Sequence, residues 1–222
     1  MSGLQGTVLA VAETGEALRR ELHRLFVRHY ENASWETFSA DFSEKDFVIL
    51  LRRSTDGVAA GFSTQKVLRC DSARVLFSGD TVIDKAAWGE QELVKTWCRL
   101  AGAVKGMEMG TPLYWLLICK GYRTYLYLPV FFDAYWPRHD LTTPPETQAL
   151  LDTFAVAKFG AAYKDGLLRF ASPKGNLTPE LASRLGLRDV VGGVVVTEVE
   201  AGSFADDVGM TRGDVITEIN RQ

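Results

Sequence analysis

The chain has 222 residues, of which 46% are hydrophobic and 24% are charged. These values are typical of a folded globular protein and exclude a chain that is disordered throughout or a fibrous repeat. Lys and Arg together number 25 and Asp and Glu number 28, which gives a formal net charge of −3. This balance argues against a nucleic-acid binder, which carries a concentrated basic face, and against binding to an anionic membrane surface.

Short segments indicate the compartment and the metal content. The N-terminal stretch MSGLQGTVLAVAETGE lacks the basic region of a signal peptide. The apolar run Met109–Cys119 is shorter than the roughly 20 residues that a membrane-spanning helix requires. The cysteines are widely spaced and form no CxxC pair or Cys/His cluster, so we expect no bound metal. The sequence therefore predicts a cytoplasmic protein without a metal site.

The first part of the chain predicts a strand, two helices and a hairpin. Residues 4–12 fit a first strand. Thr14 can cap the helix that follows, and Ser34 can cap a second one. The apolar run 46–51 predicts a buried strand, and the turn after it contains Gly57, which accepts the positive φ that tight hairpin turns require.

The next elements are predicted as strands at 58–68 and 73–83, a helix at 89–100, a strand at 112–119 and an aromatic, helical segment at 122–135. A last helix opens at Thr143, in a capping box with prolines in the first turn, and ends at Gly160. This order of elements predicts an α/β (α+β) domain with a mixed, mainly antiparallel sheet flanked by helices.

The distribution of aromatic residues indicates a domain boundary. From Ala171 onward, Phe204 is the only aromatic residue, and Gly, Val, Asp and Glu dominate. We therefore expect a first domain at 1–170, a polar linker at 171–176 and a second segment at 177–222.

The order of elements in the first domain resembles the GNAT acyltransferase fold. In that family the fourth strand leads into a glycine-bearing loop, and the loop and the following helix N-terminus hold the pyrophosphate of acetyl-CoA or another acyl-CoA. The matching stretch here is 82–91, in which Glu90 adds negative charge beside the anion site. The resemblance assigns cofactor binding to Val82, Lys85, Trp88, Gly89 and Glu90.

Acyl transfer to an amine requires a base for the acceptor and an acid for the departing thiolate. In the family a tyrosine that follows the fifth strand often serves as the acid, and the resemblance implies Tyr125 or Tyr127 for this role. Asp84 or Asp80, near the end of the fourth strand, would serve as the base. Alternatively, the tyrosines belong to an aromatic stripe that packs in the core.

The C-terminal segment 177–222 contains the runs LTPELASRLGL, GVVVTEV, GSFADDVGM and RGDVITEIN. Together they resemble the PDZ domain of HtrA/Do-type proteases. The resemblance implies that a peptide or protein C-terminus adds to a strand edge, with its carboxylate on free backbone N–H groups. The residues assigned to peptide binding are Gly192, Gly193, Val194, Val195 and Val196.

Two features limit this second resemblance. The chain contains no serine nucleophile motif such as GxSxG, so we expect no protease activity. The segment stops before the helix that forms the second wall of the groove in the family, so the groove is expected to be incomplete. A bare strand edge also favours self-association.

The sequence leaves several functions open. The chain is interpreted first as a PDZ-containing protein whose C-terminal segment binds peptides or protein C-termini. The alternative is a CoA-dependent N-acyltransferase with a regulatory or vestigial PDZ tail. A degenerate acyltransferase fold that acts as a scaffold, and a tail fragment without binding activity, also remain open.

Overall fold

The structure is a computed structural model that describes residues 3–87, 89–118, 125–138, 140–164, 167–168, 194–196, 199–207, 209–212 and 214–216. The chain forms two compact units. One consists of Met1–Ile118 and Trp136–Asn176, and the other consists of Cys119–Tyr135 and Leu177–Gln222. The residues 119–135, which the sequence analysis places in the first domain, thus group with the C-terminal segment. Within the described ranges, no helix combines the length and the apolar character that crossing a bilayer requires.

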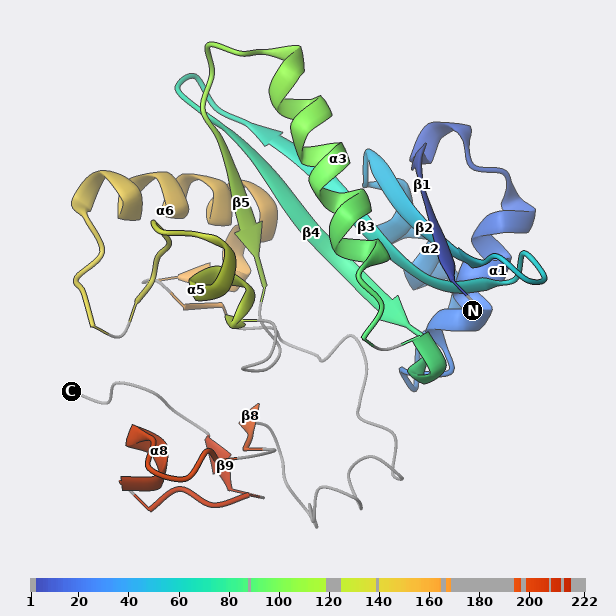
Figure 1. The fold of residues 1–222 in the computed structure, drawn as a ribbon. Coiled ribbons are helices and arrows are strands. Elements are labelled where there is room, and N and C mark those ends of the chain that lie inside the picture. Colours follow the sequence, from blue (N-terminus) through green and yellow to red (C-terminus); the bar gives the residue numbers. More distant parts are fainter. Residues whose placement is uncertain are drawn as a thin grey trace. The chain divides into compact units, whose positions relative to one another are not determined.

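The first unit is built on a five-stranded sheet in the order β1-β2-β3-β4-β5 (Figure 1). The strands are β1 (Leu4–Ala10), β2 (Phe47–Arg53), β3 (Ala59–Arg69), β4 (Arg74–Ile83) and β5 (Leu113–Leu117). Neighbours from β1 to β4 are antiparallel, whereas β4 and β5 are parallel. A parallel pair needs a crossover, which is the helix α3 (Glu92–Met107). The predicted mixed, mainly antiparallel sheet flanked by helices is confirmed.

Helices α1 (Glu16–Phe26) and α2 (Trp35–Ser43) cover one face of the sheet. Because side chains alternate along a strand, Val48 and Leu50 of β2 point to this face, with Phe62 of β3. They pack with buried side chains of the helices, which are Leu22, Leu25, Phe26, Phe38 and Phe42. Helix α6 (Pro145–Phe159) lies on the same face further along, where Phe154 packs against Val75 and Phe77.

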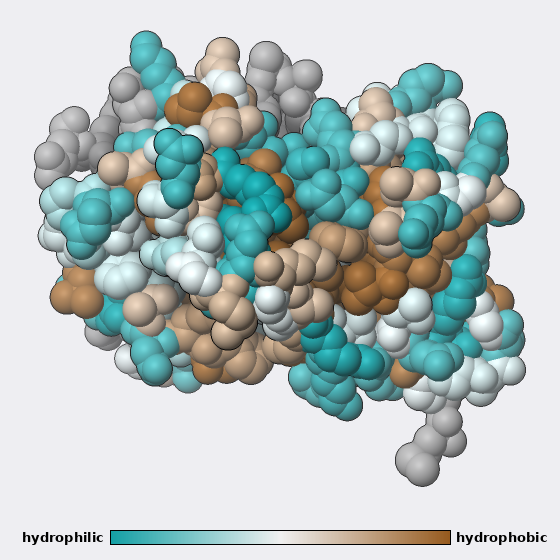
Figure 2. All heavy atoms as spheres, turned by 90° about the horizontal axis from the view of Figure 1, so that it is seen from above, coloured by the Kyte–Doolittle hydropathy of each residue, from teal (hydrophilic) through white to brown (hydrophobic). Residues whose placement is uncertain are grey.

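Helix α3 covers the opposite face. Ile49 and Leu51, which alternate with the residues of the other core, pack with Leu100 and Val104 of α3. At the end of this helix Met107 and Met109 are exposed. Figure 2, which looks at the molecule from above, shows hydrophilic and hydrophobic residues intermixed on the side that it presents.

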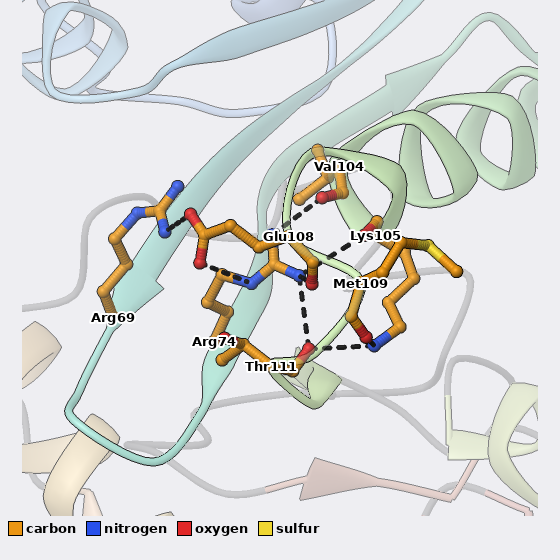
Figure 3. Close-up of polar contacts among 7 residues, drawn as sticks. All are labelled: Arg69, Arg74, Val104, Lys105, Glu108, Met109 and Thr111. Carbon is orange, nitrogen blue, oxygen red and sulfur yellow. Dashed lines mark hydrogen bonds and ion pairs between the residues drawn. The ribbon is translucent and has the colours of Figure 1, made fainter.

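The buried side chain of Arg74, at the start of β4, holds the C-terminal end of α3 (Figure 3). Its guanidinium donates to the carbonyl oxygens of Val104 at 2.7 Å, Glu108 at 2.6 Å and Thr111 at 3.2 Å. The last carbonyls of a helix have no partner within the helix, so this arginine satisfies groups that would otherwise be buried unpaired. The carboxylate of Glu108 lies 3.5 Å from Arg74 Nε and also accepts from Arg69. The hydrogen bonds of Arg74 and its pairing with Glu108 thereby fix α3 to the sheet.

The remaining elements are short. In the first unit they are the 3₁₀ turns η1 (Val11–Glu13), η2 (Lys85–Ala87) and η3 (Gly160–Ala162) and the paired strands β6 (Tyr163–Lys164) and β7 (Leu167–Leu168). In the second unit they are α5 (Tyr127–Phe131), β8 (Val194–Val195), α8 (Phe204–Asp207) and β9 (Val215–Ile216), with β8 and β9 antiparallel.

Most predicted elements of the first unit are confirmed, with corrections at their ends. Ser34 caps α2 as expected, since its side chain accepts from the Thr37 N–H at 3.1 Å. Thr14 does not cap α1, because Gly15 is the N-cap and the Thr14 hydroxyl donates to the Val11 carbonyl.

Three later helices also differ from prediction. The N-cap of α6 is Pro144, without a side-chain hydrogen bond, so the expected capping box is not formed. Helix α3 begins three residues later and ends seven residues later than expected. The helix expected over 122–135 is described as the short α5, and residues 119–124 lie outside the described ranges.

Candidate functional site

The pairing of β4 with β5 ends before β4 does. It runs from Arg74 with Leu113 to Ser78 with Leu117, where β5 ends, whereas β4 continues to Ile83 and the loop that leads to α3. On its other edge β4 is irregular: Ser63 pairs with Thr81 but Gln65 pairs with Ser78. Two β4 residues therefore stand against one β3 residue, which is a β-bulge. The bulge lies next to the point at which the β4–β5 pairing ends.

The bulge contains Gly79, and the space around it admits no side chain. A Cβ at this position would lie 2.6 Å from Thr64 Oγ1 and 3.0 Å from Lys45 Cε. The Thr64 hydroxyl is buried and has no hydrogen-bond partner among the described residues. The bulge thus presses the β4 backbone against polar groups of the α1–α2 face.

The loop after β4 leads to the first turn of α3. It contains η2 and then Gly89, which has φ +92° and is exposed. A Cβ at Gly89 would meet nothing within 4 Å, so the surroundings of the loop are open. Helix α3 starts after Gln91, which caps it without a side-chain hydrogen bond. The first N–H groups of a helix lack intrahelical partners and attract anions.

The residues predicted to bind a cofactor have different environments. Val82 is a core residue that packs with Phe62 and α1, which leaves no exposed side chain for a ligand. Glu90 is exposed beside Gly89. The backbone of Lys85 opens η2, and Trp88 lies outside the described residues.

The negative charge at the start of α3 is partly compensated. The Glu92 carboxylate accepts from Arg99 at 2.8 Å and from the Gly6 N–H at 3.3 Å. Of the two acidic residues beside the helix N-terminus, Glu92 is therefore engaged within the protein, and Glu90 lies on the surface.

Asp84, a predicted base, directly follows β4 and is mostly buried. Its carboxylate lies 3.6 Å from Arg28 and 3.6 Å from His29 Nε2. His29 Nε2 is itself buried without a hydrogen bond in the part of the chain that the structure describes. These partners come from the segment after α1, more than fifty positions earlier in the sequence. Nothing in the sequence connected His29 with Asp84 beforehand.

A set of ionisable residues that the sequence did not predict lies beside the bulge. The Lys45 side chain is 1% exposed, and its ammonium donates to the Asp41 carboxylate at 2.7 Å. Burial lowers the pKa of Lys45, whereas Asp41 and Asp80 act in the opposite direction. Burial, helped by the charge of Asp80, raises the pKa of Tyr30. Asp80, the second candidate base, therefore lies in a partly buried polar environment.

A polar network lies on the α3 face of the sheet, at the end of the β4–β5 pairing. Gln65 is fully buried; its amide donates to Ser63 at 2.8 Å, and its oxygen accepts from Ser78 at 2.8 Å and from Trp97 at 3.2 Å. Ser78 in turn accepts from Trp115 at 2.9 Å. The polar run 63–66 in the middle of a strand that begins and continues with apolar residues is the sequence signal that could have indicated this network.

The predicted acids and the predicted peptide site belong to the second unit. Tyr127 begins α5 and is 37% exposed, and the ring of Tyr125 packs against Tyr135 at 6.1 Å. Val194 and Val195 form β8, and the Val196 N–H donates to the Asp214 carbonyl at 2.8 Å. Gly192 and Gly193 lie outside the described residues. The predicted acids therefore belong to a different unit from the predicted bases Asp84 and Asp80 and from the loop that contains Gly89.

Among the residues whose placement is described, no group of three or more His, Cys, Asp or Glu side chains is arranged to hold a metal ion.

Comparison with solved structures gives GNAT acetyltransferases. An aminoglycoside acetyltransferase from an uncultured soil metagenomic sample, solved with sisomicin, is 14% identical, with a TM-score of 0.47 over 64% of this chain and 95% of that one. An aminoglycoside N-acetyltransferase solved with CoA is 12% identical, with a TM-score of 0.45 over 64% and 96%. The glucosamine-6-phosphate N-acetyltransferase of Arabidopsis thaliana is 15% identical, with a TM-score of 0.42 over 64% and 99%.

Comparison of sequences gives a different relative. A probable periplasmic DegP-like serine endoprotease of Chlamydia muridarum is 47% identical over 47 residues, and that of Chlamydia trachomatis is 45% identical over 47 residues. The match covers 21% of this chain and 10% of the relative, so this chain spans about a tenth of the length of these proteins. No family model matches the chain.

Proposed function

We propose that the unit with the five-stranded sheet is a CoA-dependent N-acyltransferase. The observation that carries the proposal is that β4 and β5 are parallel and that the crossover helix α3 begins after the end of β4. The segment β4–α3–β5 is a parallel crossover unit, and ligands of such units bind outside the carboxyl ends of the strands. A phosphate group suits the helix N-terminus that the crossover places there.

The residues of this loop fit the pyrophosphate of CoA. Gly89, at positive φ with open space around it, allows close approach to the backbone. The carboxylate of Glu92 is already engaged by Arg99, which reduces its repulsion of an anion. Bound acyl-CoA would supply the acyl group as a thioester. Asp84 or Asp80 is the proposed base for the acceptor amine. The tyrosines expected to serve as the acid, Tyr125 and Tyr127, belong to the second unit and stay a prediction from the sequence.

Titration of acetyl-CoA into the full chain tests this function directly. We expect saturable binding in calorimetry, and at a ligand concentration 100 times Kd a gain in stability of about 2.7 kcal/mol, measured as a rise in melting temperature. Pantetheine, which lacks the phosphates, serves as the matched control and should bind much more weakly. A protein that shows no saturable binding of acetyl-CoA would contradict the proposed function.

A second proposal concerns the C-terminal segment, which we infer to bind extended peptides weakly or to self-associate. The short DegP-like match and the antiparallel β8–β9 pair support it. A strand edge supplies backbone hydrogen bonds, but selectivity needs side-chain pockets. We expect weak, poorly selective binding of a hydrophobic peptide with a free C-terminus, or dimers in light scattering. The amidated peptide is the control, and a strictly monomeric chain without peptide affinity would contradict the proposal.

A further inference from the structure

A groove of about 570 Å³ runs along α1 where the helix faces the β2–β3 hairpin. We call it the α1 groove. On the helix side it extends from Ala17 to Arg28, and on the hairpin side it includes Arg52 and Ala59. At a rise of about 1.5 Å per residue, the helix side is about 16 Å long. An extended peptide of four to five residues has about this length.

The charges that line the groove are not balanced. Glu21, its acidic residue, is fully engaged: Arg52 donates to both carboxylate oxygens at 3.0 and 2.9 Å, and the Ala59 N–H donates at 3.2 Å. The hydrogen bonds from Arg52 lower the pKa of Glu21, so this carboxylate and Arg52 cancel one another near neutral pH.

Two further arginines line the groove, Arg24 and Arg28. Arg24 is exposed and donates its Nε to the Arg20 carbonyl of its own helix at 3.2 Å. The side chain of Arg28 is 61% exposed, and its 3.6 Å separation from Asp84 exceeds the length of a hydrogen bond. Both guanidinium groups thus offer donors toward solvent, and a carboxylate is the group that matches their fork geometry.

One end of the groove lies next to the candidate site. Arg28 lies beside Asp84, and the Asp84 N–H donates at 2.8 Å to the carbonyl of Ala60, the neighbour of Ala59 in the groove wall. At this end of the groove, Arg28 is thus a neighbour of the proposed base Asp84.

We propose that the α1 groove binds the acyl acceptor as an extended peptide whose acidic side chains, close to its free amino terminus, contact Arg24 and Arg28. This inference rests on the proposed acyltransferase function and names the substrate class of that site. The Glu21–Arg52 pair forms the neutral middle of the groove and holds the hairpin wall in place.

Binding is measured on the full chain without CoA, by calorimetry with the pentapeptide amide Glu-Asp-Ala-Ser-Ala and its neutral counterpart Gln-Asn-Ala-Ser-Ala. We expect the acidic peptide to bind more tightly and its affinity to fall with added salt. Replacement of both Arg24→Gln and Arg28→Gln should weaken it about tenfold, the sum of two exposed ion pairs. The variant Arg20→Gln, on the same helix but outside the groove, should bind as the unmutated chain does. Melting temperatures verify that each variant is folded.

The outcomes separate the two proposals. Equal affinity for both peptides, or acidic-peptide binding that the double substitution leaves unchanged, overturns the groove inference. Free L-glutamate binding as tightly as the peptide overturns the peptide class. Specific acidic-peptide binding without saturable acetyl-CoA binding supports the groove and overturns the acyltransferase proposal. Acetyl-CoA binding without affinity for the acidic peptide overturns the groove inference alone.

Discussion

Arg74→Met is expected to lower the free energy of unfolding by about 3–4 kcal/mol, because it removes a buried guanidinium donor from the Val104 and Glu108 carbonyls at the end of α3. The Thr111 carbonyl keeps a donor in Lys105. The guanidinium donates to Val104, Glu108 and Thr111, and methionine fills a similar volume without replacing any of these hydrogen bonds. The rings of Trp97 in α3 and Trp115 in β5 pack with their centroids 4.5 Å apart. Urea unfolding followed by tryptophan fluorescence therefore measures the loss of stability.

Arg69→Met is the matched control for this experiment. Its side chain is 53% exposed and shares Glu108 with Arg74, so its loss should change the free energy of unfolding by less than about 1 kcal/mol. Similar effects of the two substitutions would contradict a specific role of Arg74 in holding α3, and would indicate that the pairing with Glu108 contributes most of the stabilisation.

The sequence predicted the fold where local signals and the tertiary structure agree. Gly57 adopts φ +70° in the β2–β3 turn, and Ser34 caps α2, because both features depend on their immediate neighbours. Successive apolar residues of β2 point in turn to the two faces of the sheet, as expected for side chains along a strand. The order β2-β3-β4 then follows from the short connections between these antiparallel strands.

The candidate site was predicted less completely, because its residues meet over long distances in the sequence. Nothing local to Asp84 indicates that Arg28 and His29 lie beside it. Lys45 and Arg74 are buried against the usual preference of their residue types, which becomes visible only when their partners are known. Val82 lies in the expected stretch, but the alternation of β4 directs its side chain into the core.

The bulge in β4 is a feature of the backbone that the sequence did not predict either. Gly79 permits close approach to Thr64 and Lys45, yet a single glycine in a strand does not specify where an extra residue is inserted. The bulge changes which β4 side chains face α3: Ser78 and Thr81 both lie opposite α3-facing residues of β3, although they are three positions apart. Regular alternation would have placed them on opposite faces.

Gly89→Val is expected to weaken acetyl-CoA binding about a hundredfold or more. A β-branched residue is strained at φ +92°, so the loop should move to negative φ and turn its N–H groups away from the pyrophosphate. Loss of two charge-assisted hydrogen bonds, at about 1.5–3 kcal/mol each, corresponds to at least this change in Kd. Calorimetric titration of acetyl-CoA into the variant and into the unmutated chain measures it.

Gly57→Val separates this local effect from backbone strain in general. Gly57 also has positive φ, at +70°, and open space around a Cβ, but it lies in the β2–β3 turn rather than in the loop before α3. Both substitutions should lower the melting temperature by a similar amount, since both place a β-branched side chain in the left-handed region. Only Gly89→Val should change the Kd for acetyl-CoA. If the two variants bind acetyl-CoA equally well, the loop between β4 and α3 does not hold the pyrophosphate.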